Sequence, residues 1–523
     1  MSEFAWLEAP LAYERVPERF NMVPVLVDRH LAAGRGERRA ILTPDRAVTY
    51  GELAAGVARA AHLFQRLGVQ LEQRVAILLP DSPEFVYAFL GAMKAGMVPV
   101  PLSTLGSPDE YDYALRDSRA VALVTHARLY GQVERVWPAV PTLRHCLVVA
   151  GDPPRTVPFE AAHAAEPSSF DAALTHRDDM AYWLYSSGTT GRPKAIIHLH
   201  HDMLFCVEPY VRHVLGLAAD DRTFAVPRLF FSYGLTSCVY LPFWCGASTV
   251  LVADRPDPPR VFELCAKLRP TVFFSVPTSF AALLREAETA PPDLSSLRLC
   301  VSAGEPLPAP LYERWVRRTG VECLDGLGAT EVGYIYVSNR PGAVRPGSSG
   351  QLLPGYRAKI VDEAGREAPP DAVGDLWMSG ESLAAGYWNK HEKTRAAFHG
   401  EWFRTGDRYR VDADGYYVYQ GRADDLLRVG GNWVSPLEVE ACLLEHPAVA
   451  ECAVVGGLDA DGLLKPRAYV VVHRGTGADG LEDALRAHAR TRLPPFKVPR
   501  WVTVVDELPK TATGKVQRFR LRA

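Results

Sequence analysis

The stretch YSSGTTGRPKA, Tyr185 to Ala195, is the most informative segment of this 523-residue chain. Its glycines and short hydroxyl side chains permit a tight loop whose backbone N–H groups converge on phosphate oxygens, and Lys194 adds a positive charge. It lacks the Gly-Lys-Ser/Thr ending of the common nucleotide-triphosphate loop, which argues against an ordinary P-loop enzyme. A surface turn of similar composition is the alternative, and the rest of the chain decides between the two.

The composition is that of a globular protein, with 48% hydrophobic and 23% charged residues and a net charge of −3. This balance predicts neither nucleic acid nor an anionic membrane as a partner. No apolar stretch approaches the roughly 18 residues of a membrane span, and the first residues, MSEFAWLEAP, lack the pattern of a signal peptide. The nine cysteines are scattered without the paired spacing of zinc sites. We therefore expect a reduced, cytoplasmic protein.

Helix and strand signals alternate over the first two-thirds of the chain. Thr49 and Glu52 form a capping box before an amphipathic helix that Gly68 closes, and the apolar run VAILL (75–79) follows. Further apolar runs, such as STVLVAD and TVFFSVP, have the character of strands buried on both faces. The pattern predicts an α/β fold with a large N-terminal domain of doubly wound sheets.

The residue pattern of the sequence changes twice toward the C-terminus. From about 340 to 420, short strands punctuated by Gly and Pro predict a small antiparallel or barrel-like element. After GRADD (421–425) comes a compact tail with its own capped helix from Ser435 and its own strands. We place the boundary at Asp424, which gives an N-terminal domain of residues 1–423 and a small, mobile α+β domain of residues 424–523.

Three further stretches can serve a nucleotide. DGLGATE (325–331) supplies a hydroxyl and a hard anionic oxygen that suit a phosphate and its Mg²⁺. WFRTGD (402–407) ends in an aspartate that can accept hydrogen bonds from both ribose hydroxyls, and PKTATGKVQR (509–518) carries a lysine on a glycine turn. Each pattern also occurs by chance as a turn, a cap or a solvated basic segment.

Together and in this order, the four stretches resemble the adenylate-forming superfamily of acyl-CoA synthetases, peptide-synthetase adenylation domains and luciferases. YSSGTTGRPKA is similar to that family's phosphate loop, GATE to its Thr-Glu magnesium motif, WFRTGD to its ribose motif, GRADD to its hinge and PKTATGKVQR to its catalytic-lysine motif. The resemblance covers essentially the whole chain. It implies ATP, Mg²⁺ and coenzyme A as cofactor and co-substrates.

The resemblance also implies roles for individual residues. Catalytic roles fall to Lys515, Thr330, Glu331 and Lys194, with Glu331 on the Mg²⁺ and Lys515 between the substrate carboxylate and the α-phosphate. Asp424 would be the hinge of the small domain, and Gly430 and Gly431 would approach the CoA tunnel. The ATP-binding residues would be Thr189, Thr190, Gly191, Lys194, Gly304, Glu305, Asp325, Thr330, Asp407 and Arg422. Ala195 stands where the family usually has Gly, which puts the backbone angles of the loop in question.

The stretch PRLFFSYGLTS (227–237) resembles the substrate-pocket segment of benzoate-CoA ligases and related enzymes. Aromatic side chains there suit a flat aromatic acid, although core packing is an alternative role for any one of them. The stretch lacks the aspartate with which amino-acid-activating domains hold an α-amino group. The implied aryl pocket comprises Phe231, Ser232, Tyr233, Gly234, Ala303, Gly328, Gly333 and Tyr334.

The segment after the Thr-Glu motif departs from benzoate-CoA ligases, which typically carry a histidine there. This chain has Gly333, expected to enlarge the pocket, and Tyr334, which brings a hydroxyl. We therefore expect a benzoate with a polar ring substituent, with 2-aminobenzoate ahead of benzoate and hydroxybenzoate. The main prediction is an aryl-CoA ligase, as a monomer or homodimer. The alternative is an aryl-acid activating enzyme that loads a carrier protein, because both acceptors present the same thiol.

A histidine cluster follows the phosphate loop, with His198, His200, His201 and Asp202 close together. Its spacing suits neither a strand nor a helix metal pair, so we do not predict a metal there. Two other function classes fit less well. A non-catalytic nucleotide-binding protein would be expected to lack Lys515 or Glu331, and nothing in the chain calls for the oxygen chemistry of a luciferase.

Overall fold

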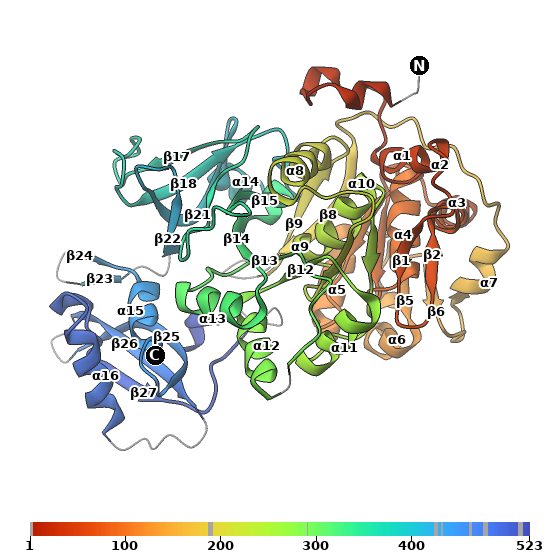
Figure 1. Cartoon of the computed structure of the whole chain (residues 1–523). Helices are drawn as coiled ribbons and strands as arrows, with labels where there is room; N and C mark the ends of the chain where they lie inside the picture. Colours follow the sequence, from red (N-terminus) through yellow and green to blue (C-terminus); the bar gives the residue numbers. More distant parts are fainter. Residues whose placement is uncertain are drawn as a thin grey trace.

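The computed structural model describes residues 4–186, 192–289, 291–422, 427–429, 432–459, 463–473, 480–510 and 516–522. It is a mixed α/β protein with a large N-terminal part and a smaller C-terminal part. The elements of the C-terminal part lie together at one end of the molecule in Figure 1. The fold class predicted from the sequence is confirmed. The helices in the described part of the chain are all too short or too polar to cross a lipid bilayer.

Several helices of the N-terminal part begin at a side-chain cap or a proline; α3, for example, begins after the Thr49–Glu52 capping box, and α4 after the Ser82 cap with Pro83 as its first residue. They are α1 (Met22–Leu26), α2 (Asp28–Ala32), α3 (Tyr50–Arg66), α4 (Pro83–Lys94), α5 (Pro108–Ser118), α6 (Ala127–Val133), α7 (Phe159–Ala164), α8 (Asp202–Tyr210), α9 (Ser232–Leu235), α10 (Leu241–Cys245), α11 (Pro258–Leu268), α12 (Pro277–Thr289), α13 (Ala309–Thr319) and α14 (His391–Ala397).

The largest sheet has nine strands and a parallel centre. Its order is β16 (Gln351–Leu352), β15 (Ile335–Ser338), β14 (Cys323–Gly328), β13 (Leu299–Ala303), β12 (Val272–Ser275), β10 (Arg222–Ala225), β11 (Ser248–Val250), β1 (Arg39–Leu42) and β2 (Ala47–Thr49). Strands β14 to β1 run parallel, and the antiparallel pairs lie at the two edges. The apolar runs in the sequence are these central strands, buried on both faces.

A second sheet of five strands is parallel throughout. Its order is β4 (Val98–Pro101), β3 (Arg74–Leu78), β5 (Ala122–His126), β6 (His145–Val149) and β7 (Val157–Pro158). A third, antiparallel sheet has the order β19 (Gly386–Tyr387), β9 (Lys194–Leu199) and β8 (Met180–Ser186). Strands β8 and β9 flank the stretch 187–191, so this small sheet positions both ends of the expected phosphate loop.

The antiparallel element expected from about 340 to 420 is a sheet of β17 (Arg357–Val361), β18 (Gly374–Ser379), β21 (Trp402–Val411) and β20 (Phe398–His399), with β22 (Tyr417–Arg422) paired to β21. The C-terminal part contains the hairpin β23 (Leu427–Val429) and β24 (Asn432–Val434), then α15 (Pro436–Leu444), β25 (Val449–Leu458), β26 (Leu464–Val472), α16 (Leu481–Arg490) and β27 (Trp501–Val504). It encloses its own apolar core. The boundary at Asp424 lies outside the described residues and stays a prediction.

The structure bears on two expectations from the sequence, one about Ala195 and one about the cysteines. Ala195 is a fully buried residue of β9, pairs with Tyr185, and is not among the described residues with positive φ. Its methyl group therefore introduces no left-handed strain.

All nine cysteines are buried or, for Cys245, half-buried, and burial raises the pKa of each thiol.

Helices α3 and α4 pack at the closest approach that glycine allows. A Cβ added at Gly91 would lie 2.6 Å from the Ala60 Cβ and 2.9 Å from the Val57 carbonyl oxygen. We expect Gly91→Ala to lower the free energy of unfolding by about 1–3 kcal/mol, because one helix must move away from the other. Thermal unfolding measures the change. The control is Gly131→Ala on α6, where no atom lies within 4 Å of the added group, and where a gain of about 0.5–1 kcal/mol is expected. Equal effects of the two substitutions would contradict this account.

Candidate active site

The carboxyl ends of four parallel strands surround one cavity of about 590 Å³. Val226 follows β10, Val276 follows β12, Ala303 ends β13 and Gly328 ends β14, and each of these residues lines the cavity. Open parallel sheets bind ligands at this edge, where loops leave the strands. The topology alone therefore makes this cavity the candidate site.

The 3₁₀ turn η6 (Thr330–Val332) follows β14 and carries the two polar residues of the GATE motif. The Glu331 carboxylate accepts hydrogen bonds at Oε1 from the Lys194 ammonium and the Tyr387 hydroxyl, each at 2.9 Å. The Lys194 Nζ also lies 3.8 Å from the centre of the Tyr387 ring. Strands β9 and β19 thus supply two partners for one carboxylate.

Electrostatics keep this carboxylate ionised. Burial alone would raise the pKa of Glu331, but the Lys194 charge and the hydrogen bonds from Lys194 and Tyr387 outweigh it, so that the pKa is lowered overall. The pKa of Tyr387 moves in the opposite direction, raised first by burial and then by the neighbouring Glu331 charge, while the Arg422 charge acts against that rise. The site therefore presents a fixed anionic oxygen beside a fixed ammonium group.

The Asp407 and Arg422 side chains form a second polar pair on the antiparallel sheet. The two residues are register partners on β21 and β22, and Arg422 Nη1 lies 3.1 Å from Asp407 Oδ1. Gly406 has a φ of +77°, and a Cβ there would lie 2.9 Å from Arg422 Nη2. Glycine at this position is therefore what allows the arginine to lie against the turn that precedes the aspartate.

The residues expected in the aryl pocket divide into two groups. Six of them line the cavity, namely Phe231, Ser232, Tyr233, Ala303, Gly328 and Tyr334, and so do the expected ATP residues Gly304, Glu305 and Thr330. Asp325 does not line it: it is buried in β14, and burial raises the pKa of its carboxyl well above the usual range.

The two expected aryl-pocket residues that do not line the cavity are Gly234 and Gly333. The expectation that Gly333 enlarges the pocket is wrong. A Cβ at Gly333 would face Cys206, Met203 and His198, on the far side of η6, and its φ of +87° explains the glycine. A Cβ at Gly234 would meet the Arg228 and Pro227 carbonyl oxygens at 2.2 and 2.4 Å. Both glycines serve the backbone and do not face the cavity.

The hydroxyl groups of the pocket residues are bonded within the protein. Tyr233 donates to the Ser275 and Val301 carbonyls at 3.2 and 3.0 Å, and Ser232 donates to the Gly333 carbonyl. The Tyr334 hydroxyl pairs with Ser237 Oγ at 2.8 Å. A hydroxyl pair keeps free lone pairs, because one bond uses one hydrogen and one lone pair. Among the expected aryl-pocket residues on the cavity wall, Tyr334 thus pairs its hydroxyl with another hydroxyl, whereas Tyr233 and Ser232 bond carbonyl groups.

Two polar residues of the site, Tyr387 and Arg228, were not among the site residues predicted from the sequence. Tyr387 belongs to no quoted motif, although it follows the pairing of β19 with β9. Arg228 lines the cavity and donates to the Val252 and Ala253 carbonyls at 2.9 and 2.7 Å. It lies 3.3 Å from Asp81, whose pKa burial raises to about 6. The contacts of Tyr387 with Glu331 and of Arg228 with Asp81 each join segments far apart in the chain.

Seven predicted residues lie outside the described part of the chain, so their roles remain predictions. They are Thr189, Thr190, Gly191, Asp424, Gly430, Gly431 and Lys515. Of the histidine cluster, His198 and His201 contact carboxylates, and His200 accepts a hydrogen bond from the Met22 backbone at 3.2 Å. Burial lowers the pKa of His200 to about 3. The described residues include no group of three or more side chains suited to a metal ion.

The chain matches known proteins along its whole length. Residues 28–388 match the family described as "AMP-binding enzyme", and residues 438–515 match "AMP-binding enzyme C-terminal domain". A benzoate-CoA ligase of Thauera aromatica is 44% identical over 512 residues, which are 97% of each chain.

Two solved structures share the fold closely. The anthranilate CoA ligase AuaEII in complex with anthranoyl-AMP superposes with a TM-score of 0.94 at 41% identity, over 98% of each chain. A benzoate CoA ligase from Burkholderia xenovorans LB400 superposes with a TM-score of 0.88 at 40% identity, over 96% of this chain and 100% of the other. The chain therefore belongs to the AMP-binding enzyme family, within the adenylate-forming superfamily that its motifs resemble.

Proposed function

We propose that this aryl-CoA ligase activates a benzoate carrying a small polar ring substituent, with 2-aminobenzoate as the preferred acid and benzoate and hydroxybenzoates as poorer substrates. The observation that carries the choice is the Tyr334–Ser237 hydroxyl pair, because Tyr334 lines the cavity together with the aromatic residues Phe230, Phe231 and Tyr233. A ring amino group can donate to a hydroxyl lone pair, whereas an unsubstituted ring leaves that polar group without a ligand partner.

The reaction joins an aromatic carboxylate to ATP and then to CoA. In the first half, a carboxylate oxygen attacks the α-phosphorus of ATP, forming aryl-AMP as the bond to pyrophosphate breaks. In the second half, the CoA thiol attacks the acyl carbon and AMP leaves. An anion attacks an anion in the first half, so the site needs positive charge more than a general base.

The described residues suit the first half-reaction. Lys194 presents an ammonium group beside Glu331, and the ionised Glu331 is the kind of hard oxygen ligand that Mg²⁺ takes. Bound there with the phosphate oxygens, Mg²⁺ would neutralise charge that develops on the phosphates. Tyr387 fixes the orientation of the Glu331 carboxylate, and the Asp407–Arg422 pair is suited to the ribose hydroxyls. The Lys515 ammonium would add charge at the α-phosphate.

An acid panel tests the substrate proposal. ATP–pyrophosphate exchange should have its highest kcat/KM with 2-aminobenzoate, followed by benzoate and the hydroxybenzoates. In Tyr334→Phe the ratio of kcat/KM for 2-aminobenzoate to that for benzoate should fall about 2- to 10-fold, the value of one neutral hydrogen bond. In Tyr233→Phe, the matched control, both acids should be affected alike, because that hydroxyl bonds only backbone carbonyls. A clear preference of the parent enzyme for benzoate would refute the proposal.

A second pair of substitutions tests the Glu331 site. Glu331→Gln should lower the exchange rate about 100-fold or more, because it removes the charge that Lys194 and Mg²⁺ require. Tyr387→Phe should cost about tenfold, since the carboxylate keeps its ammonium partner and loses one hydrogen bond to a charged group. Initial rates at saturating ATP and acid measure both. Equal losses in the two variants would mean that Tyr387 does more than orient the carboxylate.

The acceptor is tested by product analysis. The alternative function is an aryl-acid activating enzyme that loads the phosphopantetheine thiol of a carrier protein. With purified enzyme, ATP and acid, we expect aryl-CoA to form at least about tenfold faster than aryl-loaded carrier protein at equal thiol concentration, a difference of about 1.4 kcal/mol in activation free energy. Mass spectrometry of both products gives the ratio, and faster loading of the carrier would establish the alternative.

A further inference from the structure

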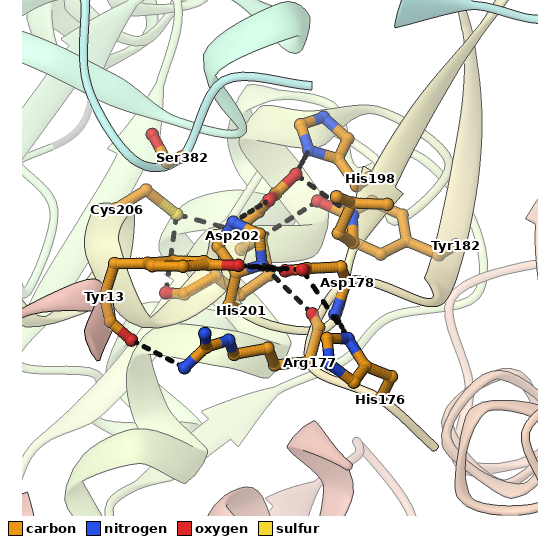
Figure 2. Close-up of polar contacts among 12 residues, drawn as sticks. Tyr13, His176, Arg177, Asp178, Tyr182, His198, His201, Asp202, Cys206 and Ser382 are labelled. Carbon is orange, nitrogen blue, oxygen red and sulfur yellow. Dashed lines mark hydrogen bonds and ion pairs between the residues drawn. The ribbon is translucent and has the colours of Figure 1, made fainter. Parts of the chain in front are cut away.

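A chain of polar side chains, fully buried at its inner end, leads from the Thr330 carbonyl toward the N-terminal segment. Figure 2 shows its members, which come from the segment 176–178, from β9 and α8, and from Tyr13 near the N-terminus. His198 and Asp202 are 0% exposed. Burying such groups costs several kcal/mol unless they are paired, so a network of this kind needs a reason.

The His198 ring makes one hydrogen bond from each nitrogen. Its Nε2 lies 2.7 Å from the Thr330 carbonyl oxygen, and its Nδ1 lies 2.8 Å from Asp202 Oδ2. A carbonyl oxygen can only accept, so Nε2 must donate. Asp202 Oδ2 already accepts from the Leu199 N–H at 3.0 Å, which matches a carboxylate that also accepts from Nδ1. The ring is thus held between a carbonyl oxygen and a carboxylate, with one nitrogen facing each.

Strand β9 explains why this ring reaches the active site. Lys194 and His198 are four residues apart on the strand, so both side chains point to the same face. Lys194 contacts the Glu331 carboxylate and His198 contacts the carbonyl of the preceding residue. The turn η6 is therefore held from one strand at two successive residues. The Thr330 carbonyl also accepts from the Gly333 N–H at 3.1 Å, so its two lone pairs are both engaged.

A second histidine, His201, lies behind the pair. His201 Nε2 lies 3.3 Å from Asp202 Oδ1, and His201 Nδ1 lies 3.1 Å from Asp178 Oδ1. Asp178 in turn accepts from the Tyr13 hydroxyl at 2.7 and 2.9 Å. On the other side, the Tyr182 ring stacks on His198 with centroids 4.9 Å apart. The ring of His198 is thus fixed in plane and in position.

We infer that His198 and Asp202 are positioning residues for the adenylation half-reaction: the Asp202-held ring of His198 fixes the Thr330 carbonyl, and with it the orientation of Thr330 and Glu331 toward ATP. The inference rests on the proposed function, because the turn it positions is the one assigned to phosphate and Mg²⁺. Neither residue is among the described residues that line the cavity.

The test is steady-state ATP–pyrophosphate exchange, with stability followed by thermal unfolding. Asp202→Asn keeps the shape of the carboxylate and removes its charge, and His198→Leu removes both ring donors. Each should lower kcat about 10- to 100-fold, the range for a hydrogen bond to a charged group, while the KM for the aromatic acid stays within about twofold. His198→Gln should recover part of the loss seen in His198→Leu, because its amide can donate to the Thr330 carbonyl.

Tyr182→Phe is the matched control. It changes the same buried layer by removing a hydroxyl that contacts Met203 Sδ, and it leaves the His198 contacts in place. We expect wild-type kcat for this variant. The inference is overturned if Asp202→Asn and His198→Leu keep the parent kcat, or if kcat and KM change together, or if glutamine restores nothing relative to leucine. An absence of exchange in the parent enzyme with every benzoate would instead refute the proposed function.

Discussion

The ion pair between Lys194 and Glu331 joins two sheets through a buried contact, beside the hydrogen bonds of Tyr387 with Glu331 and of His198 with the Thr330 carbonyl. Lys194 belongs to the small antiparallel sheet and Glu331 to the turn that leaves the nine-stranded sheet. Since burial disfavours an ionised carboxylate, Glu331 keeps its charge only while the ammonium group and the Tyr387 hydroxyl remain in place. Thr330, the residue before Glu331, lines the cavity, so that this contact also fixes one part of the cavity wall.

Much of the fold follows from short-range signals in the chain. The Thr49–Glu52 capping box begins α3 as expected, and the apolar runs become the central parallel strands. The antiparallel sheet from Arg357 to Arg422 lies where short strands punctuated by Gly and Pro predicted an antiparallel element. These features depend on residues close together in sequence, so their patterns can be read without knowing what packs against them. The family followed from the joint order of the motifs, whose residues the resemblance assigns to one common ligand.

The parts that could not be predicted depend on long-range contacts. Lys194 and Glu331 are 137 residues apart, and His198 and Thr330 are 132 apart. Tyr387 has no motif of its own and reaches Glu331 only because β19 pairs with β9. Gly333 was expected to enlarge the pocket because its side chain is small. Its direction depends on a positive φ that a lone glycine in a sequence does not reveal. The histidine cluster is a similar case. Its spacing argued against a metal site, but the residues that its side chains contact could not be predicted from that spacing.

The buried cysteines have a consequence for an enzyme that makes an activated acyl group. An acyl-adenylate reacts with any thiolate that reaches it, and a protein thiol that did so would become a dead-end thioester. Here each of the nine thiols is shielded by packing and held protonated by a raised pKa. None of them lies among the described residues that line the cavity. The chain thereby protects itself from self-acylation and leaves the activated acid to the thiol that arrives from outside.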